Sequence, residues 1–197
     1  MNPVWTQGNE YVYQKTKQVM FVNAGDFMTE FYNTNDSNFN LEFTVYLSSE
    51  DKKSIGVAPY EEVSGVELKG ISFPKLADMM YFVVDIPEFS GRVHSTNRGA
   101  HDKFAVVYYK SSNMNSGDVE PCKGSDFDKK ELTFAPPLRN FNKFTVRFLK
   151  PDGSKIKYND FSHIVSLNDT NPDTNPDSKV REMINNISLI LEFDIKA

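Results

Sequence analysis

The sequence contains little of what usually makes a redox, metal or secreted protein, since it has one cysteine, one tryptophan and three histidines. A disulfide needs two thiols, so Cys122 leaves no intrachain bridge, and a lone thiol fits assembly in a reducing compartment better than passage through a secretory pathway. We interpret Cys122 as an inert loop residue. A chain of 197 residues hides about 70% of its surface on folding, so one core suffices without disulfides or metals.

Long apolar runs and basic runs are also missing. Nowhere do about eighteen apolar residues follow one another, as a membrane-spanning helix requires, and the opening residues MNPVW lack the segments of a signal peptide. The net charge is -5, and no run of Lys and Arg would neutralise a row of phosphates. We therefore expect no membrane-spanning segment, no signal-peptide export and no direct contact with nucleic acid.

Motifs of the common enzyme sites are absent too. His94, His101 and His163 are too few and too scattered for a cupin-type metal centre, and no nucleophile elbow, Cys-X-X-Cys, His-Glu-X-X-His or phosphate loop occurs. Two alternatives stay open: paired acids among the 27 Asp and Glu residues, and a calcium site at 169–177, which lacks an EF-hand pattern. We expect no enzymatic activity and no cofactor.

Aromatic residues, in contrast, are abundant, with 16 Phe and 9 Tyr in short bulky runs between polar stretches, as is typical of strands. Segments 39–47, 143–149 and 187–195 alternate apolar and polar residues, which predicts one face in the core and one in solvent, with Ile190 as the one outward apolar exception. The eight expected strands are 17–23, 39–47, 66–73, 79–86, 104–109, 130–135, 143–149 and 187–195.

Local signals refine these strands. The apolar phase shifts within VELKGISF, which predicts a β-bulge near Lys69-Gly70. Pro136-Pro137 is expected to stop the strand at 130–135, Pro151-Asp152-Gly153 predicts a turn, and 178–185 can form a single helical turn.

The segments 79–86 and 104–109 are apolar almost throughout, which indicates cover on both faces. A second sheet would cover one face, and a neighbouring subunit or a loop the other. Burial inside one thick domain is the alternative.

Together these features predict an all-β fold, a single eight-stranded antiparallel jelly-roll sandwich with long loops, over residues 18–197 and preceded by an N-terminal arm at 1–17. The expected loops include 25–38, 48–65, 87–103, 110–129 and 150–186, with short ones at 74–78 and 136–142.

The order of four pieces resembles the penton-type single jelly-roll capsid proteins of large icosahedral DNA viruses, such as chlorella viruses and mimivirus relatives. The pieces are FNLEFTVYL (39–47), VELKGISFP (66–74), YFVVDIPEF (81–89), and PLRNFNKFTVRFLKPDG (137–153) leading into LILEF (189–193). The 150–186 loop is longer than the pattern of that family.

The resemblance implies a structural protein of the virion capsid that forms pentamers at the icosahedral vertices, beside neighbouring major and minor capsid proteins. Two alternatives remain. One is a minor capsid protein at another position; the other is a jelly-roll glycan-binding module, because sugars stack on exposed aromatic rings and bond to Asn and Asp side chains.

Three residues are candidate partner contacts. Trp5 lies on the N-terminal arm, where it would pack on a neighbouring subunit or cover its own sheet. Arg92 and Arg98 share a polar loop at 87–102, which would hold an acidic partner surface or a sulfated glycan, or stay solvated without a ligand.

Overall fold

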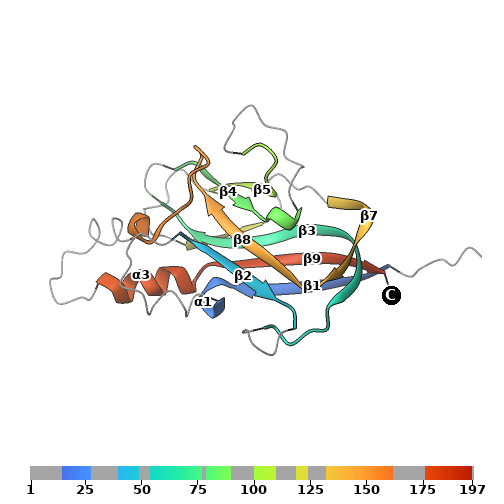
Figure 1. Cartoon of the computed structure of the whole chain (residues 1–197). Coiled ribbons are helices and arrows are strands. Elements are labelled where there is room, and N and C mark those ends of the chain that lie inside the picture. Colours follow the sequence, from blue (N-terminus) through green and yellow to red (C-terminus); the bar gives the residue numbers. More distant parts are fainter. Residues whose placement is uncertain are drawn as a thin grey trace, which may run out of the picture.

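A computed structural model describes residues 15–27, 40–48, 54–76, 79–89, 100–109, 119–123, 132–161 and 176–196. Strands dominate these ranges (Figure 1). In chain order the elements are β1 (Lys15–Asn23), α1 (Ala24–Phe27), β2 (Glu42–Tyr46), β3 (Tyr60–Pro74), β4 (Tyr81–Asp85), η2 (Pro87–Phe89), β5 (Ala105–Tyr108), β6 (Val119–Lys123), β7 (Leu132–Phe141), β8 (Lys143–Leu149), α3 (Pro176–Asn185) and β9 (Ser188–Lys196).

The strands form two antiparallel sheets. The first has the order β1-β9-β3-β6, with β7 also paired to β3, and the second has the order β2-β8-β4-β5. When β7 is set aside, the last strand lies between the first and the third, and the next-to-last lies between the second and the fourth. That is the jelly-roll order. The all-β jelly-roll sandwich is thus confirmed, and β7 is an additional strand.

Aromatic rings on the inward faces hold the two sheets together. Phe73 of β3 stacks on Phe82 of β4 with ring centroids 4.4 Å apart, and Phe193 of β9 lies 6.2 Å from Phe144 of β8. Since β3 faces β4 and β9 faces β8, the strand orders of the two sheets are aligned. The β1 edge therefore lies above the β2 edge, and the β6 edge lies above the β5 edge.

One ring, Phe89 of η2, lies at the centre of this core and is 1% exposed. Burial of such a ring is worth about 1.5–3 kcal/mol. Its ring centroid lies 5.4–6.1 Å from those of Phe104, Phe134, Phe141, Phe144 and Phe193.

The alternating segments form strands as expected. In β8, Phe144, Val146 and Phe148 are fully buried while the residues between them are half-buried. The same alternation holds in β2 and along β9. The side-chain period of two therefore decides which residues enter the core. Of the predicted segment 39–47, residue 39 lies outside the described ranges.

The predicted bulge near Lys69-Gly70 is confirmed. In the ladder between β3 and β9, Leu68 pairs with Leu191 and Gly70 with Ile190, so Lys69 has no ladder partner. The extra residue returns Ile71 to the core after Leu68. A second register shift lies between Val63 and Gly65, in a part of β3 that was expected to be loop.

The expected loops at 48–65, 110–129 and 136–142 are wrong in part. β3 begins at Tyr60, and β6 lies inside 110–129 as the sixth strand of the jelly roll. The predicted strand 130–135 instead belongs to β7, which continues past Pro136-Pro137. Among the described residues β7 pairs only with β3, and the ladder steps from Val63–Leu138 to Gly65–Thr133. Within that part of the chain the prolines therefore face no ladder partner that needs an N–H donor.

Two helices lie together at one end of the sandwich (Figure 1). α3 has ten residues, where a single turn was expected, and it buries Val180 and Ile184. α1, which begins one residue before the expected loop 25–38 and occupies its first three residues, approaches α3 so closely that a side chain at Gly25 would overlap Asn185. The predicted turn at 151–153 is present, with Gly153 at a φ of 85°.

The outer face of the second sheet is covered where β4, β5 and β8 meet. Val83, Val106 and Leu149 form a small apolar cluster there with Ala100, which lies before β5. A loop of the chain itself, the cover expected beside a second sheet or a neighbouring subunit, therefore buries Val83 and Val106 of the apolar segments 79–86 and 104–109, whereas Met80 and Tyr108 of the same segments stay exposed. Among the described helices, none has the length and apolarity needed to cross a bilayer.

Candidate functional site

The sequence-predicted contact residues Trp5, Arg92 and Arg98 lie outside the described residues, as do His94 and His163. His101 is described: its Nε2 lies 3.4 Å from Oδ2 of Asp102, and both side chains are about half exposed. The three predicted contacts therefore stay untested by the structure. The candidate functional groups among the described residues are the charged side chains and the exposed apolar side chains on the two sheets.

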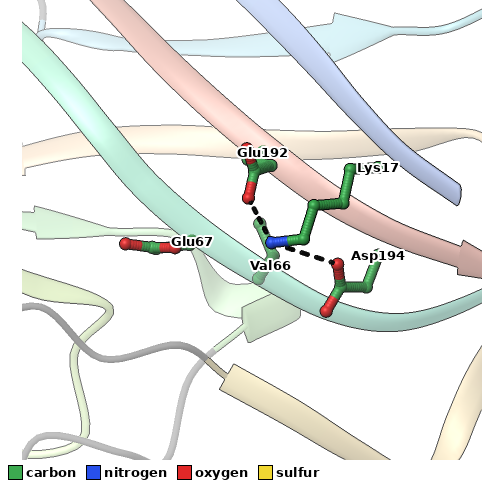
Figure 2. Close-up of a pocket in the computed structure, with 5 residues that line it drawn as sticks. All are labelled: Lys17, Val66, Glu67, Glu192 and Asp194. Carbon is green, nitrogen blue, oxygen red and sulfur yellow. Dashed lines mark hydrogen bonds and ion pairs between the residues drawn. The ribbon is translucent and has the colours of Figure 1, made fainter. Parts of the chain in front are cut away.

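A cluster of five charged side chains lies on the outer face of the first sheet; we call it the first-face ion cluster. Figure 2 shows Lys17 of β1 reaching across β9, with Nζ 2.7 Å from Oε1 of Glu192 and 3.9 Å from Oδ1 of Asp194. Nζ of Lys69 lies 2.5 Å from Oε2 of Glu67 and 3.2 Å from Oε1 of Glu192. Antiparallel register explains the convergence, because Lys17 is the ladder partner of Asp194.

These pairs keep the cluster charged. The side-chain hydrogen bond with Glu192 raises the pKa of Lys17, and the hydrogen bond from Lys17 lowers the pKa of Glu192. Neither group is poised to exchange a proton near neutral pH, as a general acid or base would be. The hollow between them, floored by Val66, is too shallow to enclose a water molecule. The cluster therefore joins β1, β9 and β3 and does not form a ligand pocket.

A row of charges crosses the outer face of the second sheet; we call it the second-face ion row. Arg147 of β8 is the ladder partner of both Glu42 and Asp85, so the three side chains project side by side. Nε of Arg147 lies 3.1 Å from Oε1 of Glu42, and Nη1 lies 3.8 Å from Oδ2 of Asp85. Lys155 extends the row at 2.6 Å from Glu42, and Lys103 extends it at 3.3 Å from Asp85.

The most buried charged side chain of the two groups lies in this row. The Asp85 side chain is only 6% exposed. Burial alone would raise the pKa of Glu42, but the contacts with Lys155 and Arg147 outweigh it and lower that pKa. The contact of Arg147 with Glu42 is an ion pair without hydrogen-bond alignment, because the buried Nε of Arg147 makes no hydrogen bond. The row ties β2, β8 and β4 together.

Exposed apolar side chains form the second kind of candidate surface. Val19 is 65% exposed and Phe21 62% exposed on the outer face of β1, while Met20 and Val22 between and beside them enter the core. Phe21 is also the ladder partner of Ile190. Sequence reasoning missed this surface because every residue from 19 to 22 is apolar, so alternation does not reveal which face is exposed.

A second exposed apolar surface lies at the ends of β4 and β5. Met80 is 68% exposed and Tyr108 is 51% exposed. The Tyr108 ring centroid lies 5.8 Å from that of Tyr81, its ladder partner. The backbone N–H of Tyr109 donates to the carbonyl of Met80 at 3.2 Å, so Met80 and Tyr108 lie at the same end of the two strands.

No metal-holding group of three or more His, Cys, Asp or Glu side chains occurs within the described ranges. Comparison of the chain with protein-family models and with curated proteins finds no match. Strand order, paired charges and the two exposed apolar surfaces are the described features that bear on function.

Proposed function

We propose that this chain is a structural protein of an icosahedral virus capsid, with pentamers at the vertices as its assembled form. In this role it contacts neighbouring major and minor capsid proteins and belongs to the virion. The observation that carries the proposal is the strand order, β1-β9-β3-β6 facing β2-β8-β4-β5, which is the jelly-roll order of viral capsid subunits.

The pieces that carry the family resemblance support the proposal by their positions. The segment 39–47 contains β2, 66–74 is the second half of β3, and 81–89 joins β4 to η2. The last piece runs from β7 through β8 to the turn at 151–153 and leads into β9. All of them therefore supply core strands or the turns that connect core strands, as expected of a shared fold.

The physical properties of the sandwich suit a building block. Rings that pack around Phe89 make the core stiff, and ion pairs connect neighbouring strands on both outer faces. A ring of identical subunits needs such a rigid body, because each contact must repeat at the same angle until the ring closes. The charges described on the outer faces serve strand cohesion in this proposal.

The test uses the full chain in two measurements. Native mass spectrometry of the purified protein is expected to give a species of five times the 22.5 kDa chain mass. Purified particles are expected to contain the chain at the vertices, as fitted into a cryo-electron microscopy map. A chain that stays monomeric and is missing from purified particles would overturn the proposal, and a place elsewhere in the shell would assign it as a minor capsid protein.

A glycan-binding module is the second candidate, and the Tyr81–Tyr108 pair favours it. A half-exposed tyrosine ring beside a second ring offers a face on which a sugar can stack. Glycan-array binding that disappears in Tyr108→Ala would support this function. An array without hits would remove it.

A further inference from the structure

The turn between β8 and the β-bridge at Lys155 contains the single Asp-Gly step of the chain, Asp152-Gly153, and the chain has no Asn-Gly step. Asp-Gly is the aspartyl sequence most prone to spontaneous isomerisation, because glycine has no side chain to hinder attack by its own backbone nitrogen. Asp152 is exposed and Gly153 is half-buried, so water reaches both residues. The turn therefore contains a chemically labile step outside the two charge groups described above.

The isomerisation of such a step needs no enzyme and no co-reactant except water. The nitrogen of Gly153 attacks Cγ of the protonated Asp152 carboxyl, and the carboxyl hydroxyl leaves as water with the proton of that nitrogen. Water then adds to the main-chain carbonyl carbon of Asp152 and breaks its bond to the nitrogen. The product has the mass of the original chain, but its backbone runs through the former side chain and is one methylene longer.

Hydrogen bonds hold the turn in a form that disfavours this attack. The backbone N–H of Gly153 donates to the carbonyl oxygen of Lys150 at 2.9 Å, so the attacking nitrogen must first give up that bond. Oδ1 of Asp152 accepts from the backbone N–H of Ser154 at 2.8 Å and from the hydroxyl of Ser154 at 2.6 Å. The backbone N–H of Lys150 donates to the carbonyl oxygen of Ser154 at 2.8 Å, which closes the turn.

The Ser154 hydroxyl also affects the charge of the reacting group. Its hydrogen bond to Asp152, followed by that of the Ser154 backbone N–H, lowers the pKa of Asp152 below the ordinary value, although slight desolvation opposes them. An ionised carboxylate lacks the hydroxyl that must leave as water, so it reacts more slowly than the protonated acid. The same serine therefore holds both the orientation and the charge of the carboxyl.

We propose that Asp152-Gly153 is the isomerisation site of this chain and that Ser154 protects it in the folded protein. A backbone lengthened by one methylene no longer fits the turn that ends at the β-bridge of Lys155. Lys155 contacts Glu42 at 2.6 Å, so isomerisation also loosens one end of the second-face ion row. This chemistry does not depend on the proposed function, since it holds whatever the chain assembles into.

The experiment measures isoaspartate in the full chain during incubation in mildly acidic buffer, well below the unfolding temperature. Trypsin releases the turn as the peptide 148–155, because Lys150 precedes Pro151 and is not cleaved there. Reversed-phase chromatography separates the isoaspartyl and aspartyl forms of this peptide, which have equal mass. The unmodified chain is compared with Ser154→Ala and Ser154→Thr, and Ser178→Ala in α3 is the control at a second exposed serine. Circular dichroism checks that each variant stays folded.

We expect folded Ser154→Ala to isomerise at least about threefold faster than the unmodified chain, because it loses the hydroxyl hydrogen bond. Ser154→Thr, which keeps a hydroxyl, and Ser178→Ala should stay at the unmodified rate. In concentrated urea the unmodified chain and Ser154→Ala should share one rate, faster than that of the folded unmodified chain. Equal rates for these two chains when folded, or a folded rate as fast as the unfolded one, would overturn the proposal. Different rates in urea would also overturn it, since the effect would then belong to the local sequence.

Discussion

The outer faces of the two sheets carry similar residues but have different environments. On the first sheet, Val19 and Phe21 stay exposed, and the Lys17 side chain is 62% exposed beside its acidic partners. On the second sheet, Val83 is fully buried within the small apolar cluster that includes Ala100, and the Asp85 side chain is 6% exposed within the second-face ion row. An outward position on a strand is therefore not the same as a solvated one.

The difference arises from what crosses each face. The segment that contains Ala100 packs on β4, β5 and β8, and Lys103 reaches Asp85 from the same segment. Charge pairs in that setting are screened less by water than exposed pairs. We therefore expect substitutions on the second face to change stability strongly, whereas those on the first face should change it little.

The largest expected effect comes from placing a charge on each face. Val83→Asp should lower the free energy of unfolding by about 3–5 kcal/mol, because it buries an unpaired carboxylate. Val19→Asp should lower it by less than about 1 kcal/mol, since that position is exposed. Urea denaturation of both variants checks the pair, and equal losses would contradict the difference between the faces.

Removal of the central cation of the second-face ion row should have the next largest effect. Arg147→Met leaves Glu42 and the nearly buried Asp85 without their shared partner, and we expect a loss of about 2–3 kcal/mol. The same denaturation experiment measures it. A loss that disappears in a triple variant with Glu42→Gln and Asp85→Asn would show that uncompensated charge is the cause.

The ionisation of Glu42 should appear in the pH dependence of stability. Its pKa in the folded protein is below the ordinary 4.5, so the stabilisation is present above that pH and is lost as the pH falls through the lowered value. Glu42→Gln should therefore be about 1 kcal/mol less stable at pH 7, and the difference should shrink below about pH 4. A difference that stays constant down to pH 2 would contradict the ion pair.

The smallest expected effect is that of Lys17→Met in the first-face ion cluster. Its side chain is largely exposed, so water and salt screen the pairs with Glu192 and Asp194. We expect the melting temperature of the monomer to stay within about 2 °C of the unchanged protein at 0.15 M salt. Calorimetry measures it, and a larger decrease would place this cluster with the second-face ion row.

Much of the fold could be predicted because alternation records which side chains enter the core. Phe144, Val146 and Phe148 show the pattern strictly, and the phase slip before Ile71 was enough to place the bulge. β6 could not be found in this way. Its sequence VEPCK is short, contains a proline and shows no alternation, so its pairing with β3 is a property of the folded sheet.

The candidate site was less predictable, because its pairs join residues far apart in the chain. Alternation places Glu42 and Arg147 on outward faces, but only the register of β2 and β8 shows that they are partners. The exposure of Phe21 and the burial of Val83 depend on which segment crosses each sheet, and strand periodicity contains no information on that. Trp5, Arg92 and Arg98 stay predictions, since they lie outside the described residues.

The position of β9 has a consequence for how the protein is made. β9 lies between β1 and β3 and is the ladder partner of both, although it follows β3 only after β4 to β8 have been synthesised. Until β9 has been synthesised, β1 and β3 lack the strand that pairs with both of them. Their apolar faces and open strand edges are then available to other chains. Completion of the first sheet is therefore a late event that follows synthesis of β9, and chaperones that shield strand edges should raise the yield of folded chain.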